Sequence, residues 1–240
     1  MGVVVLRDYQ QRAIDQLYEW FQKRSGNPCL VLPTGSGKSH IVAALCKDAI
    51  QNWPETRILM LTHVKELIEQ NAEKMRQHWP GAPMGIYSAS IGQKDLSEPI
   101  TFAGIQSVRT KARDLGHIDL VIIDECHLVN HKDEGGYRKL LGELKAINPH
   151  LRVIGLTATP YRLGHGLITD KPALCTAQAA LHGPGRQPGQ QGGRRPGQRA
   201  VGSNPGHAAS VAGRPAGRSP EKQGCGGQRR GRASGWLRHA

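Results

Sequence analysis

A glycine-rich stretch, LPTGSGKS, occupies residues 32–39 and contains the residue types that bind phosphate. Gly35 and Gly37 allow successive backbone N–H groups to face an anion at the N-terminus of a helix. Lys38 then reaches the β- and γ-phosphates of a nucleotide, and the hydroxyl of Ser39 is a ligand for Mg²⁺. The predicted phosphate site consists of Thr34, Gly35, Ser36, Gly37, Lys38 and Ser39.

Two adjacent carboxylates, Asp124 and Glu125, follow the apolar run LVII at residues 120–123. Such a run predicts a buried strand, and ligands bind at the carboxyl ends of the strands in open α/β sheets. Asp124 suits a contact with Mg²⁺. Glu125 suits polarising a water that attacks a phosphate, since a base must lie within one hydrogen bond of its nucleophile. An acidic N-terminus for the next helix would explain one carboxylate, but it would not explain the phosphate loop upstream.

A third polar element, Thr157-Ala158-Thr159, ends another apolar run, LRVIGL. Alone it is a weak signal, because threonines commonly end strands. Behind the phosphate loop and the carboxylates it becomes specific, since all three elements then lie at one sheet edge. Together they predict ATP and Mg²⁺ as ligands. A small-molecule P-loop kinase is disfavoured, because DECH followed by TAT has no role there.

A parallel sheet is needed to bring these side chains together, and the hydrophobic pattern predicts one. Helical periods cover residues 9–21, 40–50 and 64–79. Between them and after them lie apolar runs at residues 29–32, 57–62, 99–104, 119–124 and 151–157. Strands that are apolar throughout and alternate with helices are typical of a sheet covered on both faces. We predict a three-layer α/β domain over residues 1–168.

Residues 169–240 are predicted to be a disordered tail rich in Gly, Arg and Pro. From residue 183 onward the chain holds 15 of its 30 glycines and 11 of its 32 Lys and Arg, but one of its 19 acidic residues. Such a composition cannot offset the entropy cost of ordering. The tail therefore carries +10 of the formal +13 charge, so the total does not indicate a basic surface on the domain.

The abrupt change in composition predicts that the domain stops between residues 163 and 175. We expect the tail to be the out-of-frame translation of a G+C-rich gene, since such codons encode mainly Gly, Arg, Pro and Ala. The alternative is a selected tail whose arginines bind nucleic acid through counterion release. In that case Trp236 is the only aromatic residue of the tail for stacking on bases.

The ordered series LRDYQ, LPTGSGKS, LTHVKEL, TFAGIQSV, VIIDECH and GLTATPYR resembles the first RecA-like domain of superfamily 2 helicases of the DEAD/DEAH type. Over residues 4–168 it is most similar to the bacterial RadD-type DNA-repair ATPases. The general phosphate loop has glycine at the place of Leu32, and helicase-type loops relax that position. The resemblance implies a RecA-like P-loop NTPase fold, ATP-dependent ATPase activity, and DNA, single-stranded or branched, as partner, with RNA as the alternative.

The resemblance also implies roles for single residues. Gln10 would read the adenine edge, with Arg7 near the base. His127, Thr157 and Thr159 would couple the nucleotide to the nucleic acid. Contacts with the backbone of a nucleic-acid strand are implied for Thr62, His63, Lys65, Gly104, Gln106 and Ser107. The residues alone leave simpler interpretations open: Gln10 and Lys65 as surface residues of a helix, His63 as a helix cap, and Cys126 as a small buried filler.

Superfamily 2 helicases also use a second RecA-like domain, which supplies arginines to the γ-phosphate. Its motifs do not follow Gly166, so we expect a truncated chain with little activity alone, and a partner chain as a candidate source of that domain. The rival hypothesis is a non-catalytic nucleic-acid-binding protein that acts through its tail.

Two further expectations concern the cellular setting. The five cysteines have no paired spacing, which predicts neither a zinc site nor a disulfide framework and favours the cytoplasm. The sequence also lacks the run of about 20 apolar residues that would span a membrane.

Overall fold

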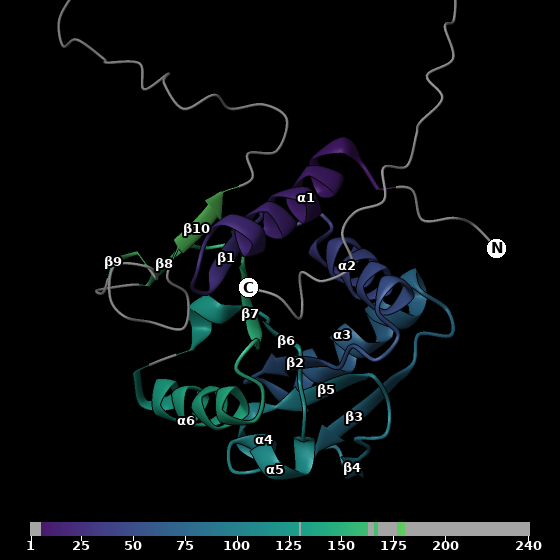
Figure 1. The fold of residues 1–240 in the computed structure, drawn as a ribbon, viewed down its shortest axis with the longest axis vertical. Helices are drawn as coiled ribbons and strands as arrows, with labels where there is room; N and C mark the ends of the chain where they lie inside the picture. The colour runs from purple at the N-terminus through teal and green to yellow at the C-terminus, as the bar shows by residue number, and fades with distance from the viewer. Residues whose placement is uncertain (1–5, 130, 163–165, 168–176, 181–240) are drawn as a thin grey trace, which may run out of the picture. The chain divides into compact units, whose positions relative to one another are not determined.

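The computed structural model describes residues 6–129, 131–162, 166–167 and 177–180 (Figure 1). All of them fall in one compact unit. The five apolar runs predicted as strands are strands: β1 (Pro28–Val31), β2 (Ile58–Thr62), β5 (Ile100–Gly104), β6 (Leu120–Ile123) and β7 (Arg152–Thr157). They are joined by β3 (Met84–Ser88), β4 (Gln93–Lys94) and β10 (Ala177–Ala180).

These eight strands form one sheet in the order β10-β1-β7-β6-β2-β5-β3-β4. Every neighbouring pair is parallel except β3 and β4, which pair antiparallel. A separate antiparallel pair is formed by β8 (Tyr161–Arg162) and β9 (Gly166–Leu167). The predicted parallel sheet is therefore confirmed, with an antiparallel strand at one edge.

Helices cover both faces of the sheet. Successive residues of a strand point to opposite faces, and because the strands are apolar throughout, both faces must be buried. One face packs against α1 (Asp8–Lys23), α2 (Lys38–Asn52) and α3 (Lys65–His78). The other packs against α4 (Ile105–Val108), α5 (Ala112–Leu115) and α6 (His131–Ile147). In β6, Ile122 belongs to the first core and its neighbour Ile123 to the second. Figure 1 shows the sheet between these two groups of helices, so the predicted three-layer fold is confirmed.

β10 lies beyond residue 168, the predicted domain boundary, and it pairs with β1 from Pro28↔Ala177 to Val31↔Ala180. Alanine and glutamine have little preference for strands, so the sequence gives no sign of it. The predicted boundary stays a prediction. Residues 181–240 lie outside the described residues, as do the disorder and the out-of-frame origin predicted for them.

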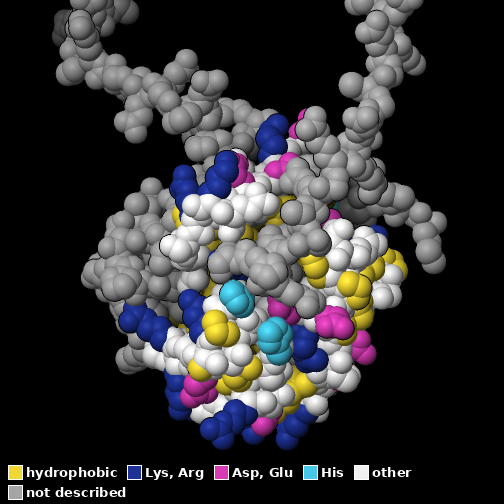
Figure 2. All heavy atoms as spheres, in the orientation of Figure 1, with side chains coloured by type: hydrophobic (Ala, Val, Ile, Leu, Met, Phe, Trp, Pro, Cys, Tyr) yellow, Lys and Arg dark blue, Asp and Glu magenta, His cyan; other side chains and the backbone are white. Residues whose placement is uncertain are grey.

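The surface of the described domain carries charges of both signs. Figure 2 shows Lys and Arg side chains interspersed with Asp and Glu on the visible face. This mixture agrees with the small net charge that the sequence assigns to the domain. Across the described helices, none combines the length and the apolar character needed to cross a membrane.

Three cysteines of the described residues, Cys29, Cys46 and Cys126, are buried and form no disulfide bond, and the Sγ atoms of Cys29 and Cys126 lie 3.7 Å apart. Cys126 packs among apolar side chains, as the interpretation of a small filler predicts. Cys46 lies in the middle of α2, and burial raises the pKa of its thiol to about 12. The thiolate, which is the reactive form, is therefore scarce at Cys46 while the chain is folded.

We predict that Cys46 resists alkylation in the native protein. At pH 8.5 an unfolded thiol is about half ionised, whereas the folded Cys46 stays protonated and out of reach of the reagent. Iodoacetamide should label Cys46 in urea and leave it unlabelled in buffer, as measured by mass spectrometry of the peptide that contains it. Fast labelling in buffer would show that the packing between α2 and the sheet is not as described.

Candidate functional site

The three predicted elements follow strands that are neighbours in the sheet. Residues 32–39 follow β1, the threonines end β7, and the two carboxylates follow β6. β7 pairs with β1 on one side and with β6 on the other. The backbone N–H of Leu32 donates to the carbonyl of Thr157 at 2.9 Å, which extends the pairing into the loop. The sheet order thus brings the three elements to one edge.

The phosphate loop has the backbone conformation that its glycines permit. Gly35 and Gly37 both have φ of +78°, and Gly37 caps the N-terminus of α2. The carbonyl of Ser36 accepts two hydrogen bonds from α1, from the Tyr9 hydroxyl at 2.7 Å and from Gln10 Nε2 at 3.0 Å. The loop is therefore held from outside by α1, in a shape that leaves the N-terminus of α2 available to an anion.

Lys38 forms an ion pair with Glu125. Lys38 Nζ lies 2.8 Å from Glu125 Oε1, and both side chains are largely shielded, with 17% and 23% exposed. The partial burial makes this pair stronger than one on the open surface. The pair brings the predicted phosphate-binding cation into direct contact with the predicted base.

Asp124 is held at both carboxylate oxygens. The backbone N–H of Glu125 donates to Asp124 Oδ1 at 2.9 Å, and Asn71 Nδ2 donates to Asp124 Oδ2 at 2.6 Å. Asn71 comes from α3 and is not among the residues that the sequence predicts for the site. The available signal was a polar residue beside Ile68, Ala72 and Met75, which form the buried face of α3.

A chain of contacts leads from Glu125 to the threonines. His127 Nδ1 lies 3.3 Å from Glu125 Oε2 and 2.7 Å from Thr157 Oγ1. Thr157 Oγ1 in turn accepts from the backbone N–H of Thr159 at 3.0 Å. Glu125 itself has φ of +45°, which lies in the left-handed region, and this conformation is energetically unfavourable for a residue with a side chain. The predicted catalytic and coupling residues therefore lie in one connected group.

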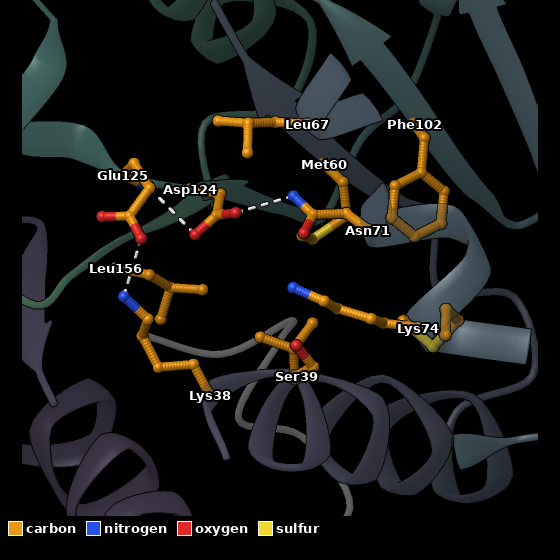
Figure 3. Close-up of a pocket in the computed structure, with 12 residues that line it drawn as sticks. Lys38, Ser39, Met60, Leu67, Asn71, Lys74, Phe102, Asp124, Glu125 and Leu156 are labelled. Atoms are coloured by element: carbon orange, nitrogen blue, oxygen red, sulfur yellow. Dashed lines mark hydrogen bonds and ion pairs between the residues drawn. The ribbon is translucent and has the colours of Figure 1, made fainter. Parts of the chain in front are cut away.

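A cavity of about 90 Å³ opens beside this group (Figure 3). Lys38 and Ser39 of α2 line one side of it and Asp124 and Glu125 the side across from them, and Figure 3 shows Asn71 and Lys74 reaching toward it from α3. Its apolar wall consists of Val42, Met60, Leu67, Met75, Phe102 and Leu156.

The donor set fits Mg²⁺. The ion prefers oxygen ligands and usually takes one or two from the protein, with the rest from phosphates and water. Ser39 and Asp124 offer a hydroxyl and a carboxylate on the same cavity. Among the residues that the structure describes, three or more metal-ligating side chains do not cluster anywhere, so a cage made of protein ligands alone is not available there.

The two residues predicted to contact the base, Arg7 and Gln10, differ in their exposure to solvent. Arg7 is exposed, whereas Gln10 is 4% exposed. Gln10 Oε1 accepts from the backbone N–H of Arg7 at 2.9 Å, and its Nε2 donates to Ser36 as described above. The amide of Gln10 is thus engaged with the protein at both ends, so it is not the surface residue that the simpler interpretation describes.

The predicted nucleic-acid contacts gather at the ends of β2 and β5, which pair from Ile58↔Ile100 to Thr62↔Gly104. Lys65 and Gln106 are exposed and His63 is partly exposed. Thr62 is 1% exposed and its hydroxyl donates to the carbonyl of Val64 at 2.9 Å, so its side chain shapes the loop. The hydroxyl of Ser107 accepts from the backbone N–H of Ala89 at 3.0 Å.

Comparison with known proteins identifies relatives of this arrangement. A family model described as "Type III restriction enzyme, res subunit" matches residues 3–162. A Saccharomyces cerevisiae protein that carries the name ATP-dependent helicase IRC3 is 32% identical over 65% of this chain and 23% of its own length. The ATP-dependent DNA helicase Hel308 of Methanocaldococcus jannaschii is 28% identical over 66% of this chain and 14% of its own.

An RNA helicase also matches: DHX58 of Mus musculus is 28% identical over 65% of this chain and 25% of its own length. The chain therefore spans about a quarter, or less, of the length of these relatives. Among solved structures, the Hef helicase domain of Pyrococcus furiosus superposes with a TM-score of 0.57 at 22% identity, over 75% of this chain and 39% of its own. At that identity the superposition supports the fold alone.

We predict that Gly37→Ala destabilises the chain more than Gly35→Ala. Both residues have φ of +78°, so each substitution costs about 1–2 kcal/mol of backbone strain. A Cβ at Gly37 would also lie 2.5 Å from Gln10 Nε2, whereas one at Gly35 would meet nothing within 4 Å. Displacing the Gln10 amide breaks its hydrogen bonds, at about 1 kcal/mol each. Urea unfolding measures both variants.

A Gln10→Ala background serves as the control. Without the amide the difference between the two glycine substitutions should shrink to the smaller effect of the remaining tight contact, His40 Nδ1 at 3.3 Å from a Cβ at Gly37. Equal costs in the wild-type background would mean that Gln10 does not hold the loop.

Proposed function

We propose, since this chain belongs to the family described as "Type III restriction enzyme, res subunit", that residues 34–39 together with Asp124 and Glu125 bind ATP and Mg²⁺. The described residues are the first RecA-like domain of a superfamily 2 helicase, and such proteins are ATP-dependent helicase-type ATPases. The observation that carries the proposal is the 2.8 Å contact between Lys38 and Glu125, because it joins a phosphate-binding cation to a carboxylate base.

Nucleotide binding would separate this pair. The γ-phosphate offers Lys38 a second anionic partner, and the loop N–H groups at the start of α2 hold the other phosphate oxygens. Released from Lys38, the carboxylate of Glu125 can accept a hydrogen bond from a water. It then takes the proton of that water as the oxygen attacks the γ-phosphorus and the bond to the β-phosphate oxygen breaks.

Mg²⁺, when bound, supplies positive charge to the β- and γ-phosphate oxygens. Ser39 and Asp124 would hold it. Asp124 keeps a fixed orientation for this role because both of its oxygens accept hydrogen bonds from the protein.

Hydrolysis needs more positive charge than the cavity contains. Among the residues that the structure describes, its cationic side chains are Lys38 and Lys74, and no arginine lines it. In related phosphoryl transfer a trans-acting arginine contributes about 10³ to 10⁵ in rate. We infer that arginines from a second RecA-like domain complete the site. The remainder of a longer protein, or a partner chain, would supply that domain.

DNA is the proposed partner, because relatives that match this chain include a protein named as a DNA helicase. RNA is the alternative, because an RNA helicase matches as well. The exposed Lys65 and Gln106, with His63, Gly104 and Ser107, are the proposed contacts, with Thr62 shaping the loop. The backbone N–H of Asp124 donates to the carbonyl of Leu61 at 3.0 Å, which links the metal side of the site to the strand that leads to these contacts.

We also propose a cytoplasmic location. The five cysteines have no paired spacing in the sequence, as in proteins of a reducing compartment.

We predict that Lys38→Ala abolishes nucleotide binding. The substitution removes the phosphate-binding cation and leaves the shielded Glu125 without its lysine partner. Titration with a fluorescent ATP analogue measures the effect. Lys23→Ala is the matched control, because Lys23 also pairs with a glutamate, Glu19, at 2.6 Å but is 68% exposed on α1. Unchanged binding in Lys38→Ala would refute the site.

We predict that the 240-residue chain alone turns over ATP very slowly, with or without DNA, although it binds the nucleotide. The charge that develops on the γ-phosphate needs a cation beyond the two lysines, and the part of the chain that the structure describes places no arginine in the lining of the cavity. A phosphate-release assay with single-stranded DNA, branched DNA and RNA measures this. DNA-stimulated hydrolysis at a helicase-like rate that is lost in Glu125→Gln would contradict the proposed need for a second domain.

A further inference from the structure

Asn71 lies on α3, outside every motif that carries the family resemblance. Its amide nevertheless reaches the carboxylate of Asp124, on the opposite side of the cavity from α2 (Figure 3). We infer, resting on the function proposed above, that Asn71 is a positioning residue. It holds Asp124 in the orientation in which that carboxylate faces Mg²⁺, and so sets how strongly the metal strengthens nucleotide binding.

The geometry leaves Asp124 one orientation. Its Oδ1 accepts from the backbone N–H of Glu125 at 2.9 Å, and its Oδ2 accepts from Asn71 Nδ2 at 2.6 Å. The first bond alone would let the carboxylate turn about Oδ1. The second, which comes from another element, fixes the carboxylate plane. Each oxygen retains a lone pair for a metal-bound water or for the metal.

The neutrality of the amide is as important as its position. A lysine or arginine at residue 71 would cancel the charge of Asp124 and compete with the cation. Asn71 donates a hydrogen bond without adding charge. The cationic side chains that line the same cavity, Lys38 and Lys74, are separate from this contact: Lys38 pairs with Glu125, and Lys74 lies three residues along α3.

Hydrogen-bond partners of metal ligands typically change metal affinity or activity by about 10- to 100-fold when they are replaced. Asn71 has the position of such a partner: it contacts the carboxylate rather than the metal. A merely structural residue would weaken nucleotide binding equally with and without Mg²⁺. A positioning residue would weaken only the contribution of the metal, and this difference can be measured.

The experiment compares the affinity of the full chain for a fluorescent ATP analogue in Mg²⁺ with its affinity in EDTA. For Asn71→Leu, a change that removes the donor, we expect the ratio of the two affinities to fall about tenfold. The affinity in EDTA should stay within about twofold of wild type. In the Asp124→Asn background the same substitution should leave the ratio unchanged, because Asn71 acts only through Asp124.

Asn52→Leu is the matched control. Asn52 Nδ2 also donates to an aspartate, Asp48 Oδ1 at 3.0 Å, but on the exposed end of α2 and away from the cavity. The metal ratio of this variant should equal that of wild type. Asn71→Asp is a second test that keeps the side-chain shape. It replaces the donor with a like charge and should lower the ratio at least as much as Asn71→Leu.

Three results would overturn the inference while leaving the proposed function standing. These are an unchanged ratio in Asn71→Leu, an equal loss in Mg²⁺ and EDTA, and tighter metal-dependent binding in Asn71→Asp, which would mean that residue 71 faces the metal itself. A wild-type chain that binds no nucleotide in either buffer would instead refute the proposed function, and the role of Asn71 with it.

Discussion

The site depends on the parallel alignment of β1, β7 and β6 as neighbours in one sheet. These strands come from distant parts of the chain, yet each ends at the same edge because all three run in one direction. The consequence is visible in the contact between Lys38 and Glu125, which are 87 residues apart. If the register of β6 shifted by one residue, the side chains of Asp124 and Glu125 would each point to the opposite face of the sheet. The two cores prevent it, since Ile122 and Ile123 are committed to opposite layers.

At Glu125 two energetic contributions oppose each other: the ion pair with Lys38 stabilises the residue, and its backbone conformation destabilises it. The left-handed conformation of Glu125 is unfavourable for a residue with a Cβ, and it persists because the surroundings hold it. Lys38 donates to one carboxylate oxygen of Glu125, and His127 Nδ1 lies 3.3 Å from the other. A nucleotide that takes Lys38 away would leave Glu125 held by its backbone and by His127. Its carboxylate could then face the cavity without a change in the backbone conformation of Glu125.

Much of this could be predicted from the sequence, for a physical reason. Strands buried on both faces are apolar throughout, and glycine loops and paired carboxylates at their ends are visible by type and spacing. The elements that escaped prediction lack such signals. β10 is made of alanine and glutamine, and the antiparallel edge strand β4 has two exposed residues. Asn71 escaped because a single amide on an amphipathic helix looks like a surface residue. Only the packing of α3 against the sheet gives it Asp124, the residue after β6, as a partner.

Helix α3 therefore touches both halves of the proposed mechanism. It begins at Lys65, beside the proposed nucleic-acid contacts, and Asn71 follows six residues later, about 9 Å along the axis at 1.5 Å per residue. Near its end, His78 stacks on His40 of α2, with ring centroids 3.6 Å apart. The pKa of His78 is held below its ordinary value, first by burial and then by His40 and Lys74, so the stacked ring stays uncharged near neutral pH. That contact ties the far end of α3 to the helix that begins with Lys38. Asn71 lies between these two points, so α3 connects the proposed nucleic-acid contacts at its start to Asp124 through a single hydrogen bond.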